Sequence, residues 1–285
     1  TYGETFPNGA DITFGGEIEG LTGSGGEDLT LIAGLTGDIT LMGNVGSANR
    51  IGTLLITQTH NASLQAISAR TLLQTTGTGT TTLNGTVNTT SATGVDITTT
   101  NIVVNALVTT IVDATVAASA PGIVNLFATA TAPGTTTGII TMLDPGRIVA
   151  SNDVTLRANR STTPAILVYE ATPADMYMTP QTRDFITTTT AGADVLIENS
   201  INFISPPQTA NNNFIINTKA ANGTITLQGP IDGDWNNFLL ISGSGAISTT
   251  STAPMIEVAT LGLQDNTAAS TGPVSLDASI TVDWI

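Results

Sequence analysis

The sequence predicts an all-β protein folded as a parallel β-helix, or β-solenoid, and three observations predict it. Thr, Val, Ile, Gly and Asn outnumber the strong helix formers Leu, Glu, Lys, Arg and Gln. Apolar residues alternate with polar ones in short segments, which is the period of a strand with one buried face. These segments recur irregularly, in repeats of about 20–30 residues, as the coils of a solenoid do.

The recurring unit is a short strand, a bend at Gly or Asn, and a second short strand. It is clearest in residues 11–18, 37–45, 79–87 and 223–231. Weaker copies occupy residues 28–35, 138–145, 153–159, 193–201 and 273–280. Since one coil cannot bury its inner face alone, we expect stacked coils to share a lumen of Ile, Val, Leu and Ala. Thr and Asn would cover the outside, where β-branched side chains fit a pleated surface.

The spacing of apolar residues distinguishes a solenoid from the alternative, one or two β-sandwich domains. The apolar anchor residues are Phe14, Leu31, Leu41, Ile56, Leu73, Leu83 and Ile97. Their gaps alternate between about 10 and about 15–17 residues, whereas a sandwich spaces its strands by about 8–12 residues with hairpin turns. Asn-Gly, a hairpin dipeptide, occurs only at residues 8, 84 and 222. We expect about 10–13 coils and a rod about 50–60 Å long.

Two segments interrupt the pattern and are expected to be loop excursions. Residues 161–185 contain three Thr-Pro pairs, and Pro cannot donate a hydrogen bond to a strand ladder. Residues 205–213 are rich in Pro and Asn. Neither segment has the composition of an interdomain linker, so we expect residues 1–285 to form a single solenoid domain. Because the chain starts at Thr1 and ends within an alternating pattern, we expect a segment of a longer or processed chain.

Composition narrows the classes of function. The chain has seven Lys and Arg against 22 Asp and Glu, a net charge of −15 and no Cys. So few basic residues argue against a nucleic-acid partner, because phosphates need a basic surface. The lack of Cys excludes disulfides, thiolate zinc sites and a cysteine nucleophile. No apolar run is long enough for a transmembrane helix, which needs about 18 residues, and abundant Thr, Asn and Gly suit export.

Three segments resemble the repeats of large bacterial surface proteins. They are residues 12–16, 36–46 and 78–90. The sequence resembles the filamentous-haemagglutinin-like and autotransporter-like β-strand-repeat proteins over residues 10–110, less closely to residue 160, and again over residues 190–280. The resemblance implies a secreted or cell-surface protein with a right-handed parallel β-helix, acting as an adhesin, stalk or filament. The chain contains none of the secretion or anchoring motifs of that group.

Catalytic chemistry has few candidates. The single His, His60, could serve a metal site or a catalytic triad, and the alternative is an outward-facing polar side chain. A glycoside hydrolase needs two carboxylates across a cleft. The candidate pairs are Glu17 with Glu19, Glu170 with Asp175, and Asp232 with Asp234. Few basic residues are present to bind acidic sugars, so we expect a non-enzymatic protein with no cofactor.

Two candidate sites remain. Asp232, Asp234 and Asn236 place oxygen ligands at alternate positions, as in the first half of an EF-hand loop, and so could bind Ca²⁺. The spacing then departs from that loop, since Asn237 and Gly243 stand where it has Gly and Glu. The alternative is a turn that packs Trp235 against the rod. In the first excursion, Asp175, Met176, Tyr177 and Met178 are the candidate binding residues, because loops on repeat scaffolds carry function. An insertion without a role is the alternative.

Three functions are therefore considered. The first is a structural stalk or surface fibre whose coils associate end to end, near residues 12–14 and 282–285, because an open strand edge exposes backbone donors and acceptors. The second is an adhesin module that binds a glycan, a host surface or ice. Thr residues occur in runs such as 187–190, not in one strict T-x-T column. The third is a polysaccharide-degrading enzyme.

Overall fold

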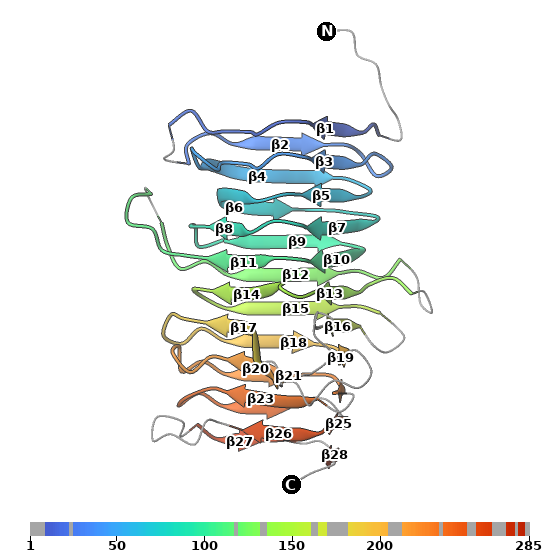
Figure 1. Ribbon diagram of the computed structural model, residues 1–285, viewed down its shortest axis with the longest axis vertical. Coiled ribbons are helices and arrows are strands. Elements are labelled where there is room, and N and C mark those ends of the chain that lie inside the picture. The colour runs from blue at the N-terminus through green and yellow to red at the C-terminus, as the bar shows by residue number, and fades with distance from the viewer. Residues whose placement is uncertain are drawn as a thin grey trace, which may run out of the picture.

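Two or three strands build each coil of this protein, and successive coils stack in parallel (Figure 1). The structure is a computed structural model. It describes residues 9–22, 25–116, 119–131, 136–160, 165–169, 182–204, 213–233, 236–249, 255–263, 272–276 and 279–282. Every strand pairing between described residues is parallel, from β1–β3 at one end to β25–β28 at the other. The predicted parallel β-helix is confirmed, and the sandwich alternative is wrong.

One sheet of eleven strands forms the first side of the coil, which we call face A. Its strands are β1 (Ile12–Phe14), β3 (Ile39–Leu41), β5 (Ala62–Leu64), β7 (Thr80–Leu83), β10 (Asn101–Val104), β13 (Ile140–Met142), β16 (Ile166–Tyr169), β19 (Ile201–Ile204), β22 (Ile231–Asp232), β25 (Met255–Val258) and β28 (Ser279–Val282). Eleven strands agree with the expected coil number, and at about 4.8 Å per coil they extend about 50 Å.

The remaining strands form one 17-stranded sheet that bends into two further sides. Face B contains β8 (Val87–Thr89), β11 (Leu107–Thr110), β14 (Arg147–Ala150), β17 (Thr182–Thr188), β20 (Asn213–Asn217), β23 (Asn237–Ile241) and β26 (Thr260–Leu263). Face C contains β2 (Leu29–Ile32), β9 (Val95–Thr99), β12 (Val124–Ala128), β15 (Val154–Ala158), β18 (Val195–Glu198), β21 (Ile225–Leu227), β24 (Ile247–Thr249) and β27 (Val274–Ser275). The long strands β4 (Ile51–Gln58) and β6 (Ile67–Gln74) run round the corner, and β6 pairs with both β8 and β9.

Coil length varies, as predicted, but two coils are longer than the expected 20–30 residues. From Ala62 to Thr81, partners on face A, the chain advances 19 residues, and from Ile102 to Ile140 it advances 38. Other coils fall between these values. The 38-residue coil carries a long connection between β11 and β12 that the sequence pattern did not identify as an excursion. In the first predicted excursion, residues 166–169 form β16 and residues 182–185 belong to β17, so the loop prediction is wrong for them. Residues 161–164, 170–181 and 205–212 lie outside the described residues.

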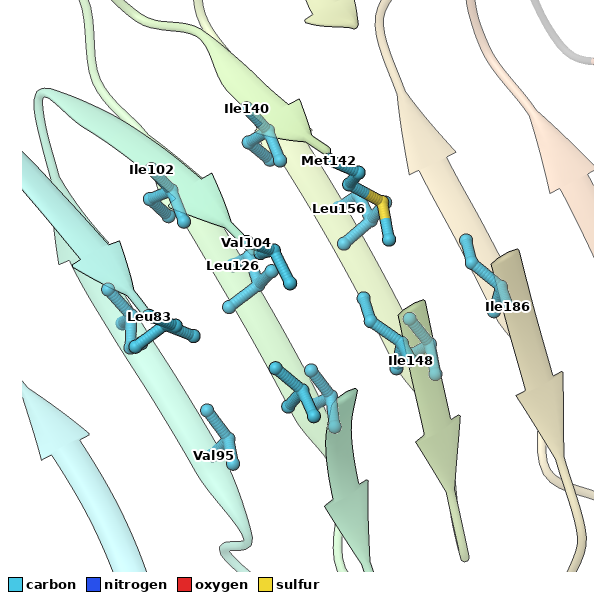
Figure 2. Packing of buried hydrophobic residues seen from close by; sticks show 14 of the residues in the cluster. Leu83, Val95, Ile102, Val104, Leu126, Ile140, Met142, Ile148, Leu156 and Ile186 are labelled. Carbon is cyan, nitrogen blue, oxygen red and sulfur yellow. The ribbon is translucent and has the colours of Figure 1, made fainter. Parts of the chain in front are cut away.

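The core is one column of apolar side chains inside the stack. The residues that alternate inward along each strand, such as Ile102, Val104, Leu126 and Ile148, are fully buried and point toward one another (Figure 2). Burying each such side chain contributes about 1.5–3 kcal/mol. Farther along the rod, Phe185, Phe203, Phe214 and Phe238 fill the lumen, with the Phe203 and Phe214 rings stacked at a centroid distance of 4.4 Å.

Several polar residues at the corner between faces B and C are buried and hydrogen-bonded. The hydroxyl groups of Thr110, Thr188, Thr218 and Ser242 donate hydrogen bonds across the corner of their own coils. Thr218, for example, donates to the Gly223 carbonyl oxygen at 2.7 Å. Each bond satisfies a buried hydroxyl that would otherwise destabilise the fold.

Candidate functional site

A column of hydroxyl side chains lies along the outside of face A. Thr13, Thr40, Ser63 and Thr82 occupy equivalent central positions in four successive strands, where each residue between two inward side chains points out. Val103 and Thr141 continue the column. The spacing along the rod is therefore that of neighbouring strands, about 4.8 Å. Runs of Thr in the sequence did not reveal this column, because its members are about 20 residues apart.

Beside this column, a ladder of acidic and amide side chains links several pairs of neighbouring coils. Asp11 accepts a hydrogen bond from the Asp38 backbone N–H, and Asp38 accepts one from Asn61, both at 2.9 Å. Asn61 accepts one from the Thr80 N–H at 2.9 Å, and Asn101 accepts one from Ile139 at 3.2 Å. We call these contacts the inter-coil ladder. Its side chains satisfy backbone donors at the start of the face A strands.

The single histidine lies on this ladder. His60 is exposed, and its Nδ1 atom lies 3.3 Å from Asp38 Oδ1 and 3.1 Å from Asn61 Nδ2. Its described neighbours are thus one carboxylate and one amide on the outer surface. This placement corresponds to the alternative reading of an outward-facing polar side chain.

The next candidate site is the carboxylate pair Glu17 and Glu19. Both carboxylates are exposed and flank Ile18, which packs against the core. Glu19 accepts hydrogen bonds from the Ser47 hydroxyl at 2.5 Å, the Asn49 N–H at 2.7 Å and the Ala48 N–H. These bonds hold the pKa of Glu19 below its usual value, with the Ser47 hydroxyl as the largest cause. Glu19 is therefore held ionised on the turn of the next coil.

Of the residues predicted to bind Ca²⁺, the structure describes Asp232 and Asn236. Asp232 is exposed on face A, and its Oδ2 atom accepts a hydrogen bond from Asn202 Nδ2 at 3.1 Å. Asn236 is buried, and its Nδ2 atom donates to the Gly233 carbonyl oxygen at 2.7 Å, which closes the turn. Asp234 and Trp235 lie outside the described residues. Calcium binding here stays a prediction.

The loop candidates cannot be placed. Asp175, Met176, Tyr177 and Met178, and the acidic partner Glu170, lie outside the described residues. Binding by this excursion also stays a prediction. Among the described residues, no group of three or more His, Cys, Asp or Glu side chains is arranged to hold a metal ion.

Face C carries a three-coil cluster whose partners were not predicted. Phe127, Arg157 and Glu198 follow one another in register on β12, β15 and β18. The Arg157 guanidinium lies 5.0 Å from the Phe127 ring centroid and pairs with Glu198 through two nitrogen atoms. Arg147 lies in the same coil as Arg157, on face B. These contacts were hard to predict from the sequence, because Phe127 and Arg157 are 30 positions apart and Arg157 and Glu198 are 41 positions apart.

The two ends of the described rod leave the core open. Ile12, Phe14, Ile18 and Leu29 in the first coil are only partly buried, as are Leu261, Leu263 and Leu276 in the last. Their register partners one coil inward, such as Ile39 and Leu41, are 1% exposed. Among the described residues, five of the eight large exposed apolar side chains lie in the end coils, namely Leu21, Ile32 and Leu35 in the first and Val274 and Ile280 in the last. The other three, Met42, Val112 and Leu143, lie farther in.

Comparison of the chain with protein-family models, with curated proteins and with solved structures finds no match in any of the three. No helix in the described part of the chain has the length and apolar character needed to cross a bilayer. The candidate functional surfaces are therefore those that the fold itself defines, which are the hydroxyl column and the two open ends.

Proposed function

We propose that this chain is a non-enzymatic structural protein of the cell exterior, a β-solenoid stalk or self-assembling subunit of a surface fibre or adhesin. The observation that carries the proposal is the continuity of the stack. Inward apolar columns run from the first described coil to the last and stay partly exposed at both ends. A second copy placed end to end would continue both the core and the strand ladders.

The composition and the sequence resemblance support the same role. Thr-rich outer faces, a net charge of −15 and the lack of Cys suit a secreted rod. The repeats resemble those of filamentous-haemagglutinin-like surface proteins, which are exported stalks and adhesins. Location at the cell surface is part of this proposal.

Electron microscopy of the purified chain at several concentrations tests the proposal. We expect filaments one rod wide with an axial repeat of about 50 Å, the span of the described coils. Removal of Ca²⁺ with a chelator, run in parallel, tests whether Asp232 and its neighbours contribute. Isolated rods at every concentration would contradict the fibre role.

A second function, binding of a glycan or another extended surface, is favoured by the hydroxyl column. Thr13, Thr40 and Thr82 present hydroxyl groups at a regular spacing on a flat sheet, as a repeating polymer would require. A glycan array with the native chain tests it, and Thr40→Val with Thr82→Val removes two hydroxyl groups while keeping the shape. Equal binding by native and variant chains would exclude this surface.

A further inference from the structure

Charge is distributed unevenly along the rod. Residues 1–49 contain seven Asp and Glu and no Lys or Arg, a formal charge of −7. Residues 220–285 contain six acidic residues and again no basic one, a charge of −6. All seven Lys and Arg lie in residues 50–219, where nine acidic residues leave a charge of only −2. The first and last segments of the sequence are therefore strongly acidic, and the middle segment is nearly neutral.

The acidic residues of the first coil lie beside its exposed apolar residues. Glu17 is exposed next to the inward Ile18, and Asp11 precedes the partly buried Ile12. Asp11 also lines a hollow of about 680 Å³ at the edge of this coil, together with Ile12, Ile32 and Leu35. The surface that would receive another coil is therefore apolar with an acidic rim.

The last coil also has exposed apolar residues, and a described acidic residue lies beside it. Ile280 lies in register with Ile256, which is fully buried, and yet Ile280 is 42% exposed. Val274 likewise lies in register with the buried Ile247 and is 41% exposed. Glu257 is exposed on the neighbouring strand, in register with Thr281.

We propose that end-to-end docking of a second copy is gated by ionic strength. This inference rests on the proposed self-assembly and adds its regulation. The apolar end coils favour stacking, because Ile280 and Val274 of one copy would be covered by the first coil of the next. Asp11 and Glu17 at the first coil and Glu257 beside the last repel each other until salt screens them. The Debye length falls from about 30 Å at 0.01 M salt to about 3 Å at 1 M.

The test compares three chains in neutral buffer at about 0.01, 0.1 and 1 M NaCl, by sedimentation velocity and electron microscopy. They are the native chain, Glu17→Lys at the first coil, and Asp144→Lys in the middle of the rod. Both substitutions change the net charge equally, and Asp144, like Glu17, is exposed. Glu17→Gln, which removes the charge without reversing it, is a second end variant. Thermal unfolding of each chain checks that it is folded.

We expect the native chain to remain single rods in low salt and to form filaments in high salt. The apparent association constant should rise more than about tenfold over this range. Glu17→Lys should form filaments at lower salt, Glu17→Gln should lie between, and Asp144→Lys should behave as the native chain does.

Three results would overturn the inference. Filaments that form equally at all salt concentrations would contradict the gating by ionic strength, but they would agree with the proposed fibre role. An equal shift for Glu17→Lys and Asp144→Lys would make overall charge, not the ends, responsible. Single rods for every chain at every salt concentration would remove both the gating and the fibre role.

Discussion

Arg157 and Glu198 form a two-pronged ion pair between adjacent coils on face C, with Arg157 Nη2 2.7 Å from Glu198 Oε1. The guanidinium also contacts the Phe127 ring of the preceding coil, so one side chain joins three coils. These side-chain contacts add to the backbone hydrogen bonds and the core packing, which already hold the three coils together.

We expect the pair to contribute a modest, salt-sensitive stabilisation. Surface ion pairs are worth about 0.2–1 kcal/mol, and a contact between a cation and an aromatic ring adds about 0.5–1 kcal/mol. Arg157→Ala should therefore cost more than Glu198→Ala, because it removes both contacts. Chemical denaturation of the two single variants and the double variant measures their coupling energy. A coupling of zero at low salt would show that the pair does not stabilise the fold.

The inter-coil ladder makes a second prediction. Asp38→Ala would remove the acceptor of the Asn61 backbone N–H and one partner of its side-chain amide. Because the Asp38 side chain is 45% exposed, water can replace it, and the loss should be about 0.5–1.5 kcal/mol. Asp38→Asn is the matched control, because it keeps an acceptor oxygen in place and should cost much less. Hydrogen exchange at the Asn61 amide should quicken in the first variant only. Equal losses of stability in both variants would show that the charge of Asp38, and not its acceptor oxygen, is responsible.

Two neighbouring leucines on β6 give a prediction about which residues of this strand face the core. Leu72 is fully buried in the core, whereas Leu73 lies on the outer side, in register with the outward Asp96. Leu72→Ala should cost about 2–5 kcal/mol by leaving a cavity, while Leu73→Ala should cost less than about 1 kcal/mol. Denaturation midpoints of the two variants compare them directly. Similar losses would contradict the alternation seen on this strand.

This pair also shows how far the sequence could predict the fold. Phe14, Leu31, Leu41, Ile56, Leu83 and Ile97 all face inward, so period-two alternation identified most of the core. Leu73 was the exception among the anchors. β6 turns a corner at Arg70 and Thr71, both of which lie outside the core, and the inward phase restarts at Leu72. A corner inside a strand leaves no Gly or Pro in the sequence to mark it.

The surfaces were harder to predict than the core for a related reason. Thr13, Thr40 and Ser63 form one column only because coils of unequal length bring them into register. The same holds for Arg157 and Glu198, which are 41 residues apart. Local alternation determines which side of a strand a residue occupies, but the lengths of the loops decide which residues become neighbours along the rod.

Glu19 makes the last prediction, on pH. Hydrogen bonds from Ser47, Asn49 and Ala48 hold its pKa in the folded chain below the value it has when unfolded. Its contribution to stability is therefore fully present above the unfolded pKa, about 4.3, and is lost as the pH falls through the lower, folded pKa. Denaturation of the native chain and Glu19→Gln should show a difference at neutral pH that shrinks in acid. A difference that stays constant down to the acid limit would contradict an ionised Glu19 on this turn.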